Sequence, residues 1–379
     1  MNRTNNNKIM PSIFTTMSKM ASEYHAINLA QGFPNFKCDP VLIDLVTEAM
    51  KDGYNQYAPM AGDLQLRVEI CKKVNTLYGR KYSPETEITI TAGATQAIFT
   101  AIAATIQEGD EVIIFTPAYD CYDPTITLFG GKTVPIQLDS PNYLPDWNLV
   151  SEKITSKTKM IIINTPHNPS GTLFTKNDML QLQELAEKNN LWVISDEVYE
   201  HIIFDGNEHH SAAKFDKLAA RTFIIASFGK TFHTTGWKMG YCLAPKNLMI
   251  EFQNVHQFNV FCVNHPVQKA LAIYLQDSEH YLGLSKFYQQ KRDHFLYLIK
   301  DSRFKIIPSK GTYFQLLDFS DISTEGDVAF TERLTKENKI AMIPTSVFNS
   351  NKEDFKQIRV CFAKNDATLI ESAAILNRL

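Results

Sequence analysis

The chain of 379 residues carries 38 basic and 41 acidic residues, a net charge of −3, and 44% of its residues are hydrophobic. This length exceeds one small core and predicts two lobes, while the composition is typical of a soluble globular protein. The small negative charge, without any basic run, argues against a nucleic-acid partner, and no apolar run approaches the length of a membrane span. We therefore expect neither nucleic acid nor a membrane among the partners.

The start of the chain and its cysteines indicate a cytoplasmic protein. The first residues, "MNRTNNNKIMPSIF", are polar and lack the apolar stretch of a signal peptide, and we expect residues 2–8 to be disordered. None of the six cysteines belongs to a C-x-x-C pair, and a chain of this length folds without disulfides. Free thiols in a reducing cytoplasm are therefore favoured over a disulfide framework or a zinc site.

The middle of the chain alternates strand-like and helix-like patterns, which is the signature of parallel βαβ units. A helix is predicted over residues 94–109, because Ile98, Ile102 and Ile106 recur four apart, with Gly109 as its end. A second, polar-faced helix is predicted over residues 181–190. The predicted strands are residues 87–93, 110–115, 159–164, 191–197 and 222–227. Their near-continuous apolar runs suit strands buried on both faces of a sheet.

The pattern changes after about residue 280, where a long helical stretch covers residues 278–300. The strand-like segments beyond it are residues 311–319, 341–348 and 358–364. Residues 11–50 also lie outside the central alternation, so we expect them to return to this second lobe.

The predicted fold class is therefore α/β, with a mainly parallel central sheet flanked by helices and a smaller α+β domain. We expect a large cofactor-binding domain over residues 41–280. The small domain would combine residues 1–40 with residues 281–379.

Polar residues follow each predicted strand of the central sheet, and ligands of such sheets bind beyond the carboxyl ends of the strands. The segments are "AGAT" (92–95), "TPAY" (116–119), "TPHNPSG" (165–171), "DEVY" (196–199) and "SFGK" (227–230). Taken singly, each is explained as a turn, a helix cap or a surface residue. Together they lie where a single ligand would touch all of them.

The residue types in these segments suit the chemistry of pyridoxal phosphate. Lys230 supplies an amine that can form a Schiff base with the aldehyde, and Asp196 a carboxylate for the pyridinium nitrogen. Asn168 and Tyr199 are candidate donors to the phenolic oxygen of the ring. Tyr119 offers an aromatic face to stack on the pyridine.

The phosphate of the same cofactor would be held at the start of the predicted helix. Backbone N–H groups of Gly93, Ala94 and Thr95 are free at a helix N-terminus, which is a ready-made anion site. Ser227 can add a hydroxyl and Lys238 a fixed cation. One lysine would thus make a covalent bond and the other would neutralise the phosphate, so neither stays a lone buried charge.

With these residues identified, the sequence resembles the fold-type I pyridoxal-phosphate enzymes, specifically the class I/II aminotransferases. The motifs that carry the resemblance, over about residues 12–379, are "NLAQGFPNF", "NQYAPMAG", "TAGATQAIF", "NTPHNPSG", "SDEVYEH", "SFGKTFHTTGWKMGY" and "IRVCFAK". Within that superfamily the chain is most similar to the branch of kynurenine–oxoglutarate transaminases and bacterial methionine-preferring aminotransferases.

The resemblance implies further roles that the residues alone would not support. Arg359 would clamp the α-carboxylate of the substrate as a bidentate fork, close to Gly32 and Asn168. Tyr57 would reach the phosphate in the neighbouring subunit, which implies a homodimer with shared active sites. Lys230 would also shuttle the proton. At the position of Lys238, aspartate-type relatives commonly have arginine.

The first functional hypothesis is a ping-pong aminotransferase that moves the amino group of an L-amino acid to a 2-oxo acid. No motif identifies a second arginine for a side-chain carboxylate, so an uncharged, apolar or aromatic substrate is favoured: methionine-like, phenylalanine or kynurenine. Phe14 and Tyr57 are candidates to line its pocket.

The alternatives to this hypothesis are a C–S lyase, an effector sensor and a nicotinamide enzyme. Relatives of this fold also eliminate β-substituents from cysteine S-conjugates, as C–S lyases, and the motifs do not exclude this reaction. An effector sensor in a transcription regulator would carry an added DNA-binding domain, and we see no length for it before "NLAQGFP". A nicotinamide enzyme would need G-x-G-x-x-G, which "TAGATQA" lacks.

Overall fold

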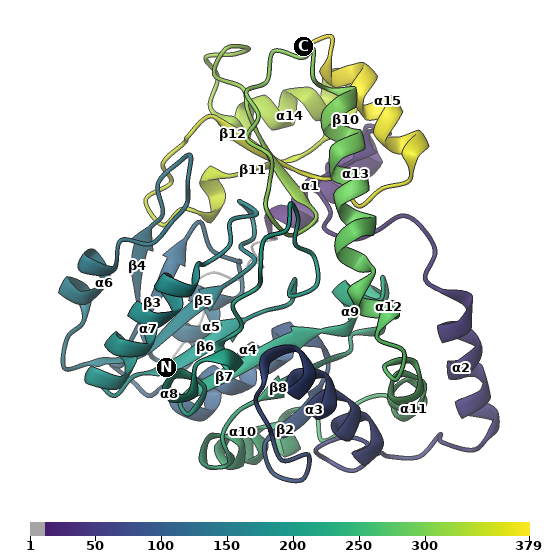
Figure 1. Ribbon diagram of the computed structural model, residues 1–379. Helices are drawn as coiled ribbons and strands as arrows, with labels where there is room; N and C mark the ends of the chain where they lie inside the picture. The colour runs from purple at the N-terminus through teal and green to yellow at the C-terminus, as the bar shows by residue number, and fades with distance from the viewer. Residues whose placement is uncertain (1–11) are drawn as a thin grey trace.

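The structure, a computed structural model, describes residues 12–379 (Figure 1). The segment predicted to be disordered, residues 2–8, lies outside the described residues. The strands are β1 (Ile27–Asn28), β2 (Ile88–Thr91), β3 (Glu111–Thr116), β4 (Lys132–Gln137), β5 (Thr158–Asn164), β6 (Trp192–Asp196), β7 (Thr222–Ser227), β8 (Gly240–Leu243), β9 (Phe314–Asp318), β10 (Ile340–Ala341), β11 (Ile343–Pro344) and β12 (Gln357–Cys361).

The helices alternate with these strands and then follow them. They are α1 (Ile13–Glu23), α2 (Pro40–Lys51), α3 (Leu64–Tyr78), α4 (Gly93–Thr105), α5 (Tyr122–Leu128), α6 (Trp147–Lys153), α7 (Lys176–Lys188), α8 (Asp216–Ala219), α9 (Phe228–Thr231), α10 (Lys246–Asn259), α11 (His265–Tyr274), α12 (Glu279–Leu282), α13 (Leu284–Leu298), α14 (Asp327–Glu337) and α15 (Asp366–Leu376). Among residues 12–379, none of these helices is both long and apolar enough to cross a bilayer.

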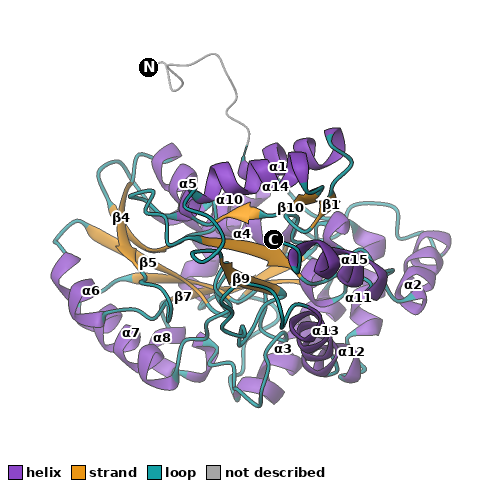
Figure 2. Cartoon of the chain, turned by 90° about the horizontal axis from the view of Figure 1, so that it is seen from above, coloured by secondary structure: helices purple, strands orange, loops and turns teal. Residues whose placement is uncertain are grey.

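The central sheet has seven strands in the order β2-β8-β7-β6-β5-β3-β4, and β8 alone runs antiparallel to its neighbours. The other pairs are parallel, which confirms the predicted fold class. Helices lie on both faces of the sheet (Figure 2). Strands β4 and β8 were not predicted; β4 contains a proline and is partly exposed, so its sequence shows no continuous apolar run.

Alternate residues of the parallel strands feed two separate cores, one on each face of the sheet. Ile161 and Val193 pack with α3 and α7, while Ile162 and Ile194 pack with α4 and α10. The apolar runs of the sequence are thus explained by burial on both faces. This packing leaves the carboxyl ends of the strands as the place where polar residues can gather.

Two smaller sheets complete the fold. Strands β11, β12 and β9 form an antiparallel sheet, and β1 pairs in parallel with β10. Residues 13–28, which form α1 and β1, therefore return to the C-terminal part of the chain (Figures 1 and 2), whereas α2 packs against α11, outside the predicted second lobe. The division into residues 41–280 and residues 1–40 with 281–379 stays a prediction, because strand pairing alone does not define a domain boundary.

Three local predictions were wrong in detail. Helix α4 ends at Thr105, short of Gly109, because Ile106 turns to extended backbone and packs into the core. The segment 278–300 is broken into α12 and α13 at Gly283. The segment 341–348 is not one strand, since it holds the end of β10, all of β11 and then a turn of 3₁₀ helix.

Candidate active site

A cavity of about 320 Å³ lies beyond the carboxyl ends of the central strands, and this size suits a small-molecule ligand. Every predicted site residue except Tyr57 lines it: Phe14, Gly32, Gly93, Ala94, Thr95, Tyr119, Asn168, Asp196, Tyr199, Ser227, Lys230, Lys238 and Arg359. Residues that are scattered along the sequence therefore share one cavity.

Lys230 is presented by α9, the short helix that begins directly after β7. Its Nζ donates hydrogen bonds to the Gly32 carbonyl oxygen at 3.1 Å and to the Tyr313 hydroxyl at 2.9 Å. Burial lowers the pKa of this amine to about 8. Part of the amine is therefore neutral near physiological pH, as nucleophilic attack on an aldehyde requires.

Asp196 is the last residue of β6 and is buried. Its Oδ2 accepts a hydrogen bond of 2.6 Å from the Tyr122 hydroxyl. Burial raises the pKa of the Asp196 carboxyl to about 6, although the Tyr122 hydrogen bond opposes this shift. A cationic ligand group beside Asp196 would favour its ionised form.

The N-terminus of α4 meets a lysine. Ala92 makes no side-chain cap, and a Cβ on Gly93 would lie only 3.2 Å from the Lys238 Nζ. Gly93 has φ of +77°, which a side chain would strain, so glycine lets the ammonium approach the helix end. A cation is unfavourable at the positive end of a helix unless an anion lies between them. The pair therefore forms an anion site.

Arg359 comes from β12 and is only 1% exposed. Its Nη1 donates to Asn168 Oδ1 at 2.8 Å, and its Nη2 donates to the Ala30 carbonyl oxygen at 2.9 Å. Its guanidinium lies 3.9 Å from the centre of the Phe314 ring and 5.1 Å from that of Phe14. Nε is buried and unpartnered among the described residues, so a carboxylate would complete this cation.

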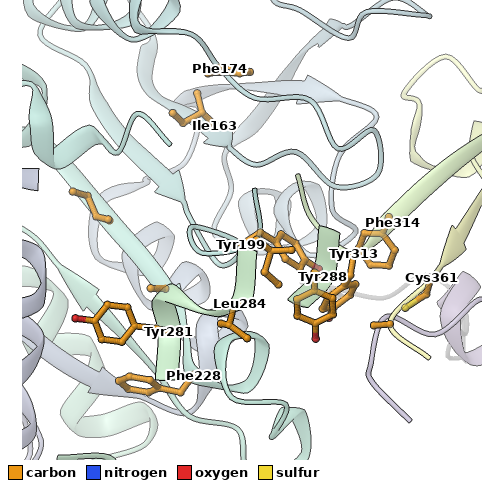
Figure 3. Close-up of a cluster of buried hydrophobic side chains, with 14 of the residues drawn as sticks. Ile163, Phe174, Tyr199, Phe228, Tyr281, Leu284, Tyr288, Tyr313, Phe314 and Cys361 are labelled. Carbon is orange, nitrogen blue, oxygen red and sulfur yellow. The ribbon is translucent and has the colours of Figure 1, made fainter. Parts of the chain in front are cut away.

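The tyrosines of the cavity are uncharged, so each offers a hydroxyl that can donate a hydrogen bond and a ring against which a ligand can pack. Burial raises the pKa of Tyr119 to about 12 and that of Tyr199 further above its usual range. The Tyr199 ring packs edge-on against Tyr313, with ring centres 5.2 Å apart. Figure 3 shows Tyr199, Tyr313, Tyr288 and Phe314 gathered in one cluster of buried rings. Both cavity tyrosines therefore keep a hydroxyl proton to donate.

Tyr57 lies away from this cavity. It is 82% exposed and lines a separate open cavity together with residues 262–266. Its ring packs edge-on against Phe261, with centres 5.5 Å apart. An exposed tyrosine and phenylalanine side by side are available to a second protein surface.

Asn164, Tyr122 and Tyr313 contact the predicted site residues but were not predicted themselves. Asn164 closes the predicted strand 159–164, and its Nδ2 donates to the Asp196 carbonyl oxygen at 2.9 Å. Its position at a strand end was a usable signal. Tyr122 and Tyr313 carried none, because nothing in their local sequence separates them from the other tyrosines of the core.

The donors present fit pyridoxal phosphate. The partly neutral amine of Lys230 suits the aldehyde, and the buried carboxylate of Asp196, which has no salt-bridge partner in the described part of the chain, suits the ring nitrogen. The N-terminus of α4 beside Lys238 suits the phosphate. The Nε of Arg359, which has no partner among the described residues, adds a further donor for a carboxylate.

Comparison with known proteins agrees with this geometry. Residues 24–375 match the family model described as aminotransferase class I and II. The methionine aminotransferase of Escherichia coli (strain K12) is 44% identical over 369 residues, covering 97% of this chain and 96% of that protein. The kynurenine–oxoglutarate transaminase of Dictyostelium discoideum is 34% identical over 399 residues, covering 95% and 92%. A solved Escherichia coli structure, reported with a methionine aminotransferase function, has a TM-score of 0.96 at 44% identity and covers 99% of this chain and 100% of that one.

Proposed function

The chain belongs to the pyridoxal-phosphate-dependent aminotransferases of class I and II, and we propose that it acts on amino acids with uncharged, apolar or aromatic side chains. The amino group passes from such an L-amino acid to a 2-oxo acid in two half-reactions of a ping-pong cycle. The predicted family, enzyme class and cofactor are confirmed. The observation that carries the proposal is that Lys230, Asp196 and Arg359 line one cavity.

The proposed cofactor grip divides among the strand ends. Lys230 would bond the aldehyde, and Asp196 would pair with the ring nitrogen. Asn168 and Tyr199 would hold the phenolic oxygen, while Tyr119 would stack on the ring. When bound, the cofactor supplies a ring that withdraws electrons from the carbon next to the amino group. The phosphate is held by Gly93, Ala94, Thr95, Ser227 and Lys238.

The proposed substrate pocket rests on the surroundings of Arg359. Its guanidinium would take the α-carboxylate, near Gly32 and Asn168, so that the side chain extends beside Phe14 and Phe314. Of the cavity-lining residues that the structure describes, Arg359 is the only arginine, so no second fork is supplied by them for an acidic side chain. These features support a methionine-like, phenylalanine or kynurenine substrate.

The proton transfers are assigned to Lys230. Once the incoming amino acid has freed it, the Lys230 amine would accept the proton from the substrate α-carbon and then donate it back. The pKa of about 8 keeps part of this amine neutral near pH 7 to 8, which a general base needs.

The proposal includes a homodimer. The exposed Tyr57 is the residue of this chain that would reach into the neighbouring site, at the phosphate. A cytoplasmic location stays a prediction.

A substrate panel tests the function. The purified enzyme should convert methionine, phenylalanine or kynurenine with several 2-oxo acids at a higher kcat/KM than aspartate. If aspartate dominates, the substrate class is wrong. Pyruvate and ammonia formed from a cysteine S-conjugate without any 2-oxo acid would instead favour the C–S lyase. Lys230→Ala should abolish both turnover and covalent attachment of the cofactor, and persistence of both would falsify the assignment.

A further inference from the structure

The amine of Lys230 is hydrogen-bonded to Tyr313, on the side of the amine away from the cavity. The Tyr313 hydroxyl accepts from Lys230 Nζ at 2.9 Å and donates its own proton to the Gly32 carbonyl oxygen at 2.6 Å. The Gly32 oxygen also accepts from Lys230 Nζ, at 3.1 Å. Tyr313 is fully buried and is not among the residues that line the cavity, so it lies on the protein side of the amine.

The number of hydrogens on the amine decides what this arrangement does. A neutral amine has two N–H bonds and one lone pair, arranged tetrahedrally with the carbon chain. Gly32 and Tyr313 are both acceptors here, because the single hydroxyl proton of Tyr313 is already donated to Gly32. Burial holds the pKa of Tyr313 well above its usual range, so the phenol keeps that proton. Both N–H bonds of the neutral amine are therefore used in hydrogen bonds to Gly32 and Tyr313. The lone pair must point in the one tetrahedral direction that these bonds and the carbon chain do not occupy.

We infer that Tyr313 is a further positioning residue, whose hydroxyl acts with the Gly32 carbonyl to aim the lone pair of free Lys230 at the α-hydrogen of the substrate. This inference rests on the proposed role of Lys230 as the base. In the step, the bond between the α-carbon and hydrogen breaks and a third N–H bond forms on Lys230. The electron pair left on carbon passes to the ring of the cofactor. The ammonium then keeps two N–H bonds on the same acceptors and presents the transferred proton as the third.

The backbone around Tyr313 is strained in a way that supports this placement. Thr312 has φ of +65°, which is a rare conformation for a β-branched residue. It is held there because its N–H donates to the Ile202 carbonyl oxygen at 2.9 Å and its Oγ1 accepts from Phe314 N at 3.1 Å. Adjacent side chains of a regular strand point to opposite faces. Tyr313 and Phe314 instead both contact residues of the same cavity, Tyr313 contacting Lys230 and Phe314 contacting Arg359. Such strain is typical of functional sites.

Tyr313→Phe tests the inference, because it removes one hydroxyl and keeps the ring. The matched control is Tyr288→Phe, since the Tyr288 hydroxyl is buried with no hydrogen-bond partner among residues 12–379 and the centre of its ring lies 5.7 Å from that of Tyr313. Each holoenzyme is reduced with borohydride, and mass spectrometry locates the fixed cofactor. Stopped-flow absorbance then follows the first half-reaction with the preferred amino acid, in α-protiated and α-deuterated form.

We expect both variants to fix the cofactor on Lys230 and to bind the amino acid with unchanged affinity. Only Tyr313→Phe should slow the half-reaction, by roughly ten- to a hundredfold, as expected for a lost hydrogen bond to a charged group and a misaimed base. Its α-deuterium isotope effect should rise, since proton transfer becomes more rate-limiting. A merely structural hydroxyl would weaken fixation or binding without this rise.

A rate and isotope effect equal to those of Tyr288→Phe would overturn the inference. That result would leave the proposed function intact as long as Lys230→Ala is inactive. Turnover by Lys230→Ala would instead overturn the function itself, so the two failures are distinct.

Discussion

Tyr122, the first residue of α5, donates a hydrogen bond of 2.6 Å to the buried carboxylate of Asp196 at the end of β6. This contact joins the start of α5 to the end of β6 and favours the charged form of Asp196 against the burial that disfavours it. The phenol therefore contributes to the ionisation on which the proposed pairing with the ring nitrogen depends.

Removing this hydroxyl should weaken cofactor binding in a pH-dependent way. In Tyr122→Phe the pKa of Asp196 should rise above its value of about 6, because a hydrogen bond to the charged form is lost. We expect the affinity for pyridoxal phosphate to fall roughly ten- to a hundredfold at pH 6 and less at pH 8, where more of the carboxylate is ionised. Equilibrium titration at both pH values measures this. Tyr82→Phe is the control, because the Tyr82 hydroxyl is buried with no hydrogen-bond partner in the part of the chain that the structure describes. An equal loss at both pH values would contradict the assignment.

Asp196→Asn should separate binding from catalysis. The amide keeps the shape and can still accept the hydrogen bond from Tyr122, but it has no charge to stabilise a protonated ring nitrogen. We expect the half-reaction to slow by roughly a hundred- to a thousandfold, while the cofactor stays attached to Lys230. Single-turnover absorbance and borohydride fixation measure the two effects. Half-transamination at the wild-type rate would remove the proposed role.

Arg359→Lys should raise KM far more than it lowers kcat. A lysine keeps the charge but loses the planar fork, the bond to Asn168 at 2.8 Å and the stacking on Phe314 at 3.9 Å. We expect KM for the amino acid to rise roughly ten- to a hundredfold. Arg333→Lys, at a partly exposed pair with Glu325, is the control and should leave KM unchanged. An unchanged KM in Arg359→Lys would place the substrate carboxylate elsewhere.

A buried ion pair supports the "DEVYE" segment from the side away from the cavity. Lys73 on α3 lies 2.6 Å from Glu200, and both side chains are 5% exposed. The Tyr78 hydroxyl also donates to Glu200, at 2.6 Å. Burial alone would raise the pKa of Glu200, but Lys73, His201 and these hydrogen bonds outweigh it and hold the pKa well below its usual range.

Replacing only Lys73 should lower the free energy of unfolding more than replacing both Lys73 and Glu200. Lys73→Met leaves an uncompensated buried carboxylate, so we expect the free energy of unfolding to fall by about 3–5 kcal/mol. The double variant Lys73→Met/Glu200→Gln should recover much of that loss. Urea unfolding of the apoprotein measures both.

The same ion pair also makes the free energy of unfolding depend on pH. Because the folded pKa of Glu200 is depressed, its contribution is complete above the unfolded value of about 4.3 and is lost as the pH falls below it. The advantage of the wild type over the double variant should therefore shrink below that pH. An advantage that stays constant from pH 7 to pH 4 and below would contradict this account.

The local sequence determined which chemical group stands at each strand end of this protein. Lys230, Asp196, Asn168 and the Gly93 turn could be identified because apolar runs mark buried parallel strands, and such strands end at one edge of the sheet. The alternation of strands and helices predicted the fold class for the same reason.

Only the tertiary structure decided which other side chains complete the site. Tyr313 and Gly32 are 281 residues apart in sequence, and Arg359 and Asn168 are 191 apart, yet each pair is hydrogen-bonded. The chain has 15 tyrosines, and no local pattern distinguishes the two whose hydroxyls reach Lys230 and Asp196. Periodicity reports whether a residue is buried, but its neighbours depend on how distant segments pack, which short-range sequence does not encode.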